Sequence, residues 1–244
     1  MNDNGRPPRW RRILLKLSGE AFAGSNSVGL DTDAINFLAQ EVADVHRAGC
    51  QVAVVVGGGN IVRGSSFSKT GIDHATADQM GMLATVINAI ALQGALERLE
   101  IETRVQSAIA MHMVAEPFIR RRAVRHLEKG RVVILGAGTG NPHFTTDTAA
   151  ALRAVELHCD ALLKATNVDG VYDSDPKSNP NAVKYSAISY QDALDQRLGV
   201  MDLTAFTMSM NHNLPVVVFN ARERGNALRV VMGEPIGTVV GAIS

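Results

Sequence analysis

Short apolar runs that end in glycine recur along this 244-residue chain. Val52–Val56 precedes three glycines, and Val132–Leu135 precedes Gly136. Continuous apolar strands are typical of parallel sheets that are covered on both faces. Helical patterns separate these runs, as where Asp31 precedes apolar residues at spacings of three and four. The sequence therefore predicts an α/β fold, a three-layer αβα sandwich with a mainly parallel central sheet.

The organisation along the chain indicates a single domain. The chain is long enough to bury a substantial core, and no Pro-, Gly- or Ser-rich linker divides it. We predict a flexible tail over residues 1–11 and one domain over residues 12–244. Within that domain, Glu116-Pro117 is expected to open a helix that Gly130 ends.

Composition excludes several classes of protein. The formal net charge is zero, which argues against a general binder of nucleic acids or membrane surfaces. Cys50 and Cys159 are isolated, so neither a disulfide framework nor a zinc site is expected. The N-terminus lacks the apolar segment of a signal peptide, which fits a cytoplasmic protein. The basic run Arg120–Arg125 is interpreted as the solvated face of a helix.

The stretch Gln79–Leu96 contains no charged residue, and its length is close to the roughly 18 residues that can span a membrane. Polar residues interrupt it, namely Gln79, Thr85, Asn88 and Gln93. Its apolar side chains fall on every face of a helical wheel, and such a helix must be covered all round. We predict a core helix whose far side meets another subunit.

Residues that suit phosphate binding follow several of the predicted strands. Gly136, Gly138 and Gly140 precede Thr145 or Thr146, either of which can begin a helix. Glycines let backbone amides approach a ligand, and a helix N-terminus favours an anion. A loop of this kind is also an ordinary strand-to-helix connection, so its function depends on its neighbours.

Two lysines strengthen the case for phosphate chemistry. Lys16 and Lys164 each follow a Leu-Leu pair near the carboxyl end of a predicted strand, where ligands bind in open α/β sheets. Gly57–Gly59 and Arg63 add amides and a guanidinium. Such a set suits phosphoryl transfer, which depends on positioning and charge neutralisation. The chain has no GxxxxGK[ST], GxSxG or HExxH motif, and no GxGxxG with a downstream acidic residue.

Taken together, the motifs resemble the bacterial uridylate (UMP) kinase family, which has the amino-acid kinase fold. They occur in order as Lys16–Gly19, Gly57–Asn60 with Arg63-Gly64, Asp78 through Met82–Thr85, Thr139–Pro142 through Thr145–Asp147, Lys164–Thr166 with Asp169–Tyr172, Val200–Asp202, and Gly237-Thr238. The resemblance implies phosphorylation of UMP to UDP by ATP with Mg²⁺, without a covalent intermediate, in de novo pyrimidine nucleotide (UTP and CTP) biosynthesis. It also implies a cytoplasmic, allosteric homohexamer (a trimer of dimers) that UTP inhibits.

Site residues follow from the same resemblance. The expected catalytic residues are Lys16, Arg63, Asp147 and Lys164. The expected ATP-binding residues, mainly in the C-terminal part, are Lys16, Leu17, Ser18, Gly19, Gly59, Arg63, Thr166, Asn167, Tyr172 and Asp175. The expected UMP-binding residues are Gly58, Asp78, Thr139, Gly140, Asn141, Pro142, His143, Phe144, Thr145 and Thr146. Magnesium is expected to arrive on the ATP phosphates, so no protein metal ligand is predicted.

A GTP effector site is implied less completely. The residues that match it are Gly24, Ser25, Asn26, Ser27, Val28, Gly29, Arg104 and Arg131. Gln93 and Glu97 stand where activated members often carry basic residues, so GTP is expected to activate weakly. Another departure is His143, which stands where an aromatic residue is usual.

Two other functions remain open from the sequence. One is a carboxylate kinase of the same fold, acting on a substrate such as acetylglutamate or aspartate. The other is a non-catalytic nucleotide sensor, which would tolerate the loss of Lys16.

Overall fold

The computed structural model describes residues 7–26, 28–62, 71–176 and 178–241. The described strands are β1 Arg12–Leu17, β2 Gln51–Val56, β3 Thr103–Ser107, β4 Glu116–Pro117, β5 Val132–Gly136, β6 Ala161–Thr166, β7 Ala187–Ile188, β8 Val216–Asn220 and β9 Thr238–Val240. The described helices are the 3₁₀ helix η1 Gly19–Ala23 and the α-helices α1 Thr32–Arg47, α3 His74–Arg98, α4 Arg120–Glu128, α5 Thr146–Glu156, α6 Tyr190–Asp195, α7 Leu203–Asn211 and α8 Asn226–Val231.

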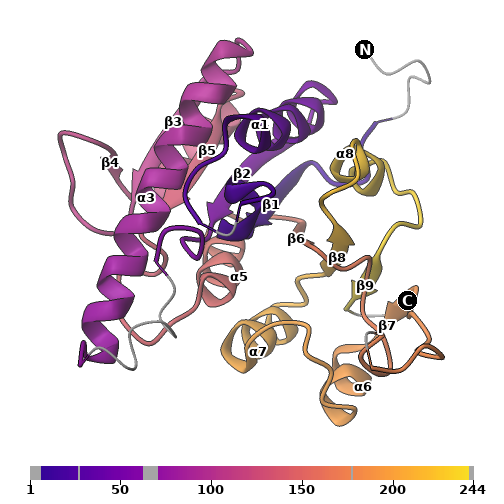
Figure 1. Ribbon diagram of the computed structural model, residues 1–244. Coiled ribbons are helices and arrows are strands. Elements are labelled where there is room, and N and C mark those ends of the chain that lie inside the picture. Colours follow the sequence, from indigo (N-terminus) through magenta and orange to yellow (C-terminus); the bar gives the residue numbers. More distant parts are fainter. Residues whose placement is uncertain (1–6, 27, 63–70, 177, 242–244) are drawn as a thin grey trace.

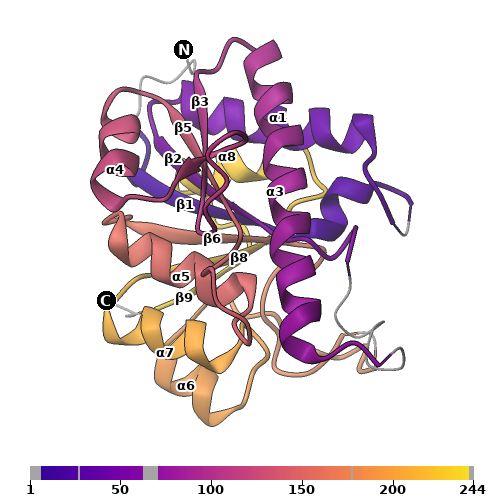
Figure 2. The same ribbon diagram turned by 90° about the vertical axis from the view of Figure 1, so that its left-hand side faces the viewer.

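The described strands form one sheet in the order β4-β3-β5-β2-β1-β6-β8-β9-β7. Neighbouring strands run parallel except β8 and β9, which are antiparallel. Helices cover both faces, and Figures 1 and 2 show α3 on one side of the sheet and α5 and α7 on the other. The predicted αβα sandwich with a mainly parallel sheet is confirmed.

Alternate residues of β1 pack into different layers. Ile13 and Leu15 lie in the core beneath α1, α3 and α8, whereas Leu14 lies in the core beneath α4, α5 and α7. Successive side chains of a strand point to opposite faces, so Lys16 points to the same face as Leu14. Lys16 therefore faces α5 at the carboxyl end of the central strand.

The uncharged stretch forms most of α3, as predicted. Length and composition alone would let this 25-residue helix cross a membrane, yet half of its most apolar window is buried inside the protein. The helix packs against α1, β3 and β5. Leu83, Ile87 and Ile90, at spacings of four and three, remain 40–46% exposed along one face. The core position of α3 is confirmed, and its exposed face is available for another subunit.

The helix predicted to open at Glu116-Pro117 begins later. Glu116 and Pro117 instead form β4, which pairs with β3 at the edge of the sheet. A proline lacks the N–H that a ladder needs, and an edge strand tolerates that loss. Helix α4 starts at Arg120, with buried Ala123 and Leu127 on one face and the arginines on the other, as predicted for the basic run.

The folded part of the chain begins before residue 12. Trp10 is 9% exposed and belongs to the core, and the Arg9 N–H donates to the carbonyl of Val231. Arg9 and Trp10, which were predicted to belong to a flexible tail over residues 1–11, are therefore part of the folded domain, and residues 1–6 lie outside the described residues.

Candidate functional site

Three charged side chains meet at the carboxyl ends of β1 and β6. Lys16 and Lys164 are directly paired in the register of these strands. Asp147 bridges them, with Lys16 Nζ 2.9 Å from Oδ1 and Lys164 Nζ 2.6 Å from Oδ2. Lys164 also donates to the carbonyl of Val200 at 2.6 Å. The carboxylate holds two ammonium groups side by side, which concentrates positive charge at the carboxyl ends of β1 and β6.

The start of α5 places Asp147 in this arrangement. Thr145 is the N-cap residue, and its hydroxyl accepts the N–H groups of Asp147 and Thr148. Asp147 thus lies in the first turn, where the helix dipole stabilises a negative charge. Burial by itself raises the pKa of Asp147, but the ammonium groups of Lys16 and Lys164 hold it below its usual range. The carboxylate is therefore ionised at neutral pH.

The glycine loops after β1 and β2 approach each other so closely that Gly19 and Gly57 cannot be replaced by residues with side chains. A Cβ on Gly19 would lie 2.5 Å from the Gly59 nitrogen, and one on Gly57 would lie 2.6 Å from the Gly19 nitrogen. By contrast, a Cβ on Gly59 would meet no atom within 4 Å. Glycine is thus required for packing at Gly19 and Gly57, while Gly59 borders open space that a ligand can use.

Polar residues of α3 anchor two of these loops. Asn88 donates to the Gly57 carbonyl at 2.7 Å and exchanges hydrogen bonds with Asn60. The hydroxyl of Thr85 accepts the Ala137 N–H at 2.7 Å, next to β5. Both side chains are buried, and buried polar groups are costly unless they are paired. Their hydrogen bonds therefore define where the glycine loops lie relative to α3.

Most residues expected to bind UMP line one cavity of about 290 Å³. From that expected set, the cavity is lined by Gly58, Asp78, Thr139, Asn141, Phe144, Thr145 and Thr146. Gly140, Pro142 and His143 are outside this lining. Gly140 has a φ of 82°, and a Cβ there would lie 3.1 Å from the Ala108 carbonyl oxygen, so the turn itself favours glycine. His143 stacks on His74, with ring centroids 5.0 Å apart.

A second cavity of about 520 Å³ is lined by Lys164. Thr166, Tyr172 and Asp175, all expected to bind ATP, line it. The Tyr172 hydroxyl donates to Asp169 at 2.7 Å, and this hydrogen bond raises the pKa of Tyr172. An aromatic ring beside a carboxylate can receive a base and a ribose.

Other members of the expected ATP set lie apart from this cavity. Leu17, Ser18 and Asn167 border a third cavity of about 590 Å³ beside α1. Thr166 lines both cavities, so the two adjoin at the end of β6. Arg63 and Ser27 lie outside the described residues.

Comparison with known proteins identifies the family of this chain. Residues 11–220 match the Amino acid kinase family. This chain belongs to the amino acid kinase family. Solved structures agree: a UMP kinase from Bacillus anthracis is 41% identical with a TM-score of 0.94, and 98% of each chain is covered. A UMP kinase from Ureaplasma parvum is 40% identical with a TM-score of 0.91, over 96% of this chain and 100% of that one. A uridylate kinase from Archaeoglobus fulgidus is 31% identical with a TM-score of 0.74, over 94% and 99%.

The expected effector residues of this family member fall into two groups at opposite ends of the sheet. Gly24–Gly29 follows η1, near the carboxyl end of β1, and Gly29 bonds to Asn60. Arg104 and Arg131 lie near the amino ends of β3 and β5. The two groups do not form one site within a single copy of the chain.

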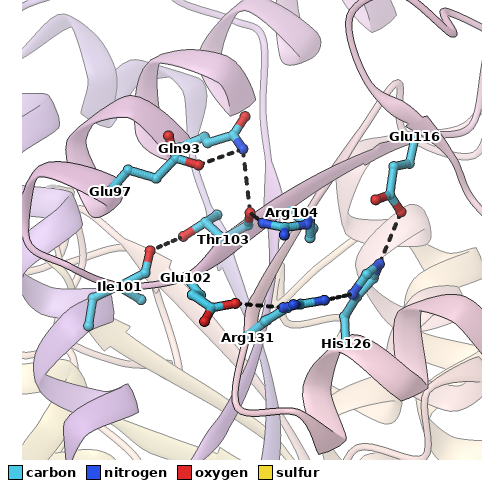
Figure 3. A network of polar contacts seen from close by, with 9 residues as sticks. All are labelled: Gln93, Glu97, Ile101, Glu102, Thr103, Arg104, Glu116, His126 and Arg131. Atoms are coloured by element: carbon cyan, nitrogen blue, oxygen red, sulfur yellow. Dashed lines mark hydrogen bonds and ion pairs between the residues drawn. The ribbon is translucent and has the colours of Figure 1, made fainter.

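Figure 3 shows that both arginines are already engaged. Arg131 pairs with Glu102 at 2.8 Å and contacts His126 at 3.2 Å, while Arg104 donates to the Thr103 carbonyl. Gln93 donates to Glu97 at 3.0 Å in the same network. An anion that binds here would have to compete with acidic side chains.

Asp202, to which the sequence assigned no role, is brought next to the site by the fold. It accepts hydrogen bonds from the hydroxyls of Thr145 and Thr148 and caps α7 through the Ala205 N–H. These hydrogen bonds connect the start of α5, which carries Asp147, to the segment before α7. The same segment contains Val200, whose carbonyl accepts a hydrogen bond from Lys164. The position of Asp202 directly before α7 makes it the N-cap of that helix. Only the fold shows that the same carboxylate reaches α5.

Proposed function

We propose that this member of the amino acid kinase family is a UMP kinase, which transfers the γ-phosphoryl group of ATP to UMP. The observation that carries the proposal is the position of the Lys16–Asp147–Lys164 cluster. Lys164 lines the cavity of about 520 Å³, and Asp147 directly follows Thr146, which lines the cavity of about 290 Å³. The cluster thus adjoins both a cavity suited to ATP and a smaller one suited to an acceptor.

The reaction in this geometry is a direct, in-line displacement. A phosphate oxygen of UMP forms a bond to the γ-phosphorus of ATP, and the bond from that phosphorus to the β–γ bridging oxygen breaks. ADP leaves with the bonding electrons, and UDP forms. No proton must move from the acceptor when its phosphate is a dianion. Lys16 and Lys164 stabilise the charge that spreads over the transferring group, while Asp147 keeps both ammonium groups oriented.

The ATP side of the site is proposed to lie in the cavity of about 520 Å³. Tyr172 would contact the base, and Asp175 would bind ribose hydroxyls. Both oxygens of Asp147 are engaged by lysines, so this carboxylate is unsuited to hold Mg²⁺. The ion is instead proposed to arrive on the phosphate oxygens of ATP, where it neutralises charge.

The acceptor side is proposed to lie in the smaller cavity. Gly58, Gly59 and Gly138 line it without side chains, so backbone amides can approach a phosphate. Asp78 lines the same cavity and can accept hydrogen bonds from ribose hydroxyls. A carboxylate here suits a ribose and would repel the carboxylate of acetylglutamate or aspartate, so UMP is favoured over those acceptors.

We further propose that several copies assemble through α3, whose exposed Leu83, Ile87 and Ile90 form an apolar stripe. Burial of such a stripe against a second copy removes apolar surface from water. The relatives' activity and the resemblance together support a cytoplasmic homohexamer that makes UDP for pyrimidine nucleotide biosynthesis and is inhibited by UTP.

The test is ADP release measured with UMP, CMP, dTMP, acetylglutamate and aspartate as acceptors. UMP should give the highest kcat/KM. A preference for a carboxylate substrate would replace the proposal with a carboxylate kinase, and ATP binding without turnover of any acceptor would indicate a sensor. UMP and 2′-deoxy-UMP should then be compared, because equal use of both would contradict the role given to Asp78.

A further inference from the structure

Two histidines and an aspartate meet at the mouth of the smaller cavity. His74 and Asp78 are one turn apart at the start of α3, with His74 Nδ1 3.0 Å from Asp78 Oδ2. His143 comes from the loop before α5, and its backbone N–H donates to the same carboxylate at 2.7 Å. The two imidazole rings are stacked with an angle of 16° between their planes. One potential ligand atom from each residue lies within 4.8 Å of the others.

This trio has the chemistry of a transition-metal site. Two imidazoles with one carboxylate suit Zn²⁺, Cu²⁺ or Ni²⁺, whereas Mg²⁺ and Ca²⁺ prefer oxygen ligands. Three protein ligands with an open position are typical of accessible zinc sites. Tetrahedral zinc holds its ligand atoms roughly 3.3 Å apart, given bonds of about 2.0–2.2 Å. His74 and Asp78 are already near that separation, and the exposed His143 ring needs only a rotation to join them.

The backbone of His143 supports the arrangement. Its φ of 71° is in the left-handed region, which is uncommon for a residue other than glycine. The N–H bond to Asp78 holds that conformation and brings the imidazole over His74. The same bond orients the carboxylate from outside, as hydrogen bonds to metal-binding carboxylates commonly do.

We propose that His74, Asp78 and His143 bind one divalent transition-metal ion such as Zn²⁺, and that this ion excludes the acceptor nucleotide. The exclusion rests on the proposed function, because it assumes that the acceptor ribose needs Asp78. A metal ion coordinated by the Asp78 carboxylate occupies the oxygens that would otherwise accept hydrogen bonds from the ribose. Zn²⁺ therefore acts as an inhibitor competitive with UMP.

Metal binding is tested without turnover. Zn²⁺ is titrated into the full-length, nucleotide-free protein in competition with a chromogenic zinc chelator. We expect one ion per chain, and His74→Gln and His143→Gln should each weaken binding by at least about 10-fold, since loss of even an outer partner of a metal ligand costs about 10–100-fold. His212→Gln, which changes an exposed histidine at the end of α7, is the matched control.

Thermal unfolding serves as the second measurement. Zn²⁺ should raise the Tm of the native protein and of the His212→Gln variant, because an ion that binds only the folded state stabilises it. The rise should be absent in both site variants, whose Tm without zinc shows that they fold. Equal zinc affinity in all four proteins would overturn the site.

Competition is tested by repeating the chelator titration with UMP. Saturating UMP should weaken Zn²⁺ binding at least about 10-fold if both need Asp78. Unchanged zinc binding in the presence of UMP would overturn the exclusion and the Asp78 ribose contact, while the metal site itself would stand. Loss of the metal site in the first titration would leave the kinase proposal untouched.

Discussion

Asp147 organises the site at the scale of single residues. One carboxylate offsets two lysines that the strand register would otherwise leave side by side with like charge. The charges that would stabilise a departing phosphoryl group are thus in place before any ligand binds. Preorganised charge of this kind costs no rearrangement during the reaction.

Replacement of Lys16 should affect turnover much more than binding. In Lys16→Ala we expect kcat to fall by roughly 10²-fold or more, because the ammonium acts most strongly in the transition state. ATP affinity should change little. Steady-state kinetics and ATP titration separate the two effects, with Lys129→Ala at an exposed position as the control. A near-normal kcat would remove Lys16 from the mechanism.

Asp147 should also make stability depend on pH. Its pKa in the folded state lies below the ordinary value of 3.8, so it stabilises the fold above that pH and stops doing so as the pH falls through the folded value. Asp147→Asn should lower the free energy of unfolding by up to about 3 kcal/mol at neutral pH, because both lysines lose their counterion. Denaturant titrations at about pH 7 and about pH 3 should show this difference shrinking. A constant difference would show that the charge of Asp147 contributes nothing.

At the scale of elements, α3 combines core packing, contacts to the glycine loops, residues of the acceptor cavity and an exposed apolar stripe. Buried residues pack it against α1 and the sheet, while Thr85 and Asn88 anchor the glycine loops. His74 and Asp78 are at its amino end, beside the acceptor cavity. Its remaining face carries the apolar stripe of Leu83, Ile87 and Ile90.

A charge on that stripe should break the assembly. In Leu83→Asp/Ile87→Asp we expect a shift toward a single chain in solution, because burial of two unpaired carboxylates in an apolar contact is costly. Light scattering coupled to size-exclusion chromatography measures the mass. Leu203→Asp, at an exposed position on α7, should keep the mass of the native protein. A variant that keeps the native mass would place the contact elsewhere.

At the scale of the whole molecule, the sheet brings together segments that are distant in the chain. β1 lies between β2 and β6, so Lys16 is paired with Lys164, a residue 148 positions later in the chain. Because β1, β2, β5 and β6 run parallel, the loops that follow them all lie at the carboxyl-terminal end of the sheet. The opposite end of the sheet carries the Arg104 and Arg131 network (Figure 3).

That network bears on regulation. We expect GTP to activate weakly or only at high concentration, since Glu97 repels a triphosphate, Gln93 adds no charge, and Glu102 already occupies Arg131. UTP should still inhibit, because most of the residues expected to bind UMP line the acceptor cavity. The measurement is UMP kinase rate against GTP at fixed ATP, with Gln93→Arg/Glu97→His alongside. Strong activation of the native protein at micromolar GTP would contradict this expectation.

The sequence by itself determined the elements and many of the site residues. Period and apolar content are local properties, so the strands that contain Lys16 and Lys164, the cap at Asp31 and a helix start at Thr145 or Thr146 could be predicted directly. The family motifs predicted which loops contribute to the same nucleotide site. Glu116-Pro117 was misread because a proline fits both a helix start and an edge strand, and only pairing with β3 decides between them.

Only the tertiary structure decided which side chains meet. Thr85 and Asn88 look like interruptions of an apolar helix until the fold places glycine loops beside them. The histidines look scattered in the sequence, yet the loop before α5 brings His143 onto His74 and Asp78. Gly24–Gly29 and Arg104 look like one effector set, yet the sheet separates them. Such contacts join positions far apart in the chain, so strand order and packing determine them and local pattern does not.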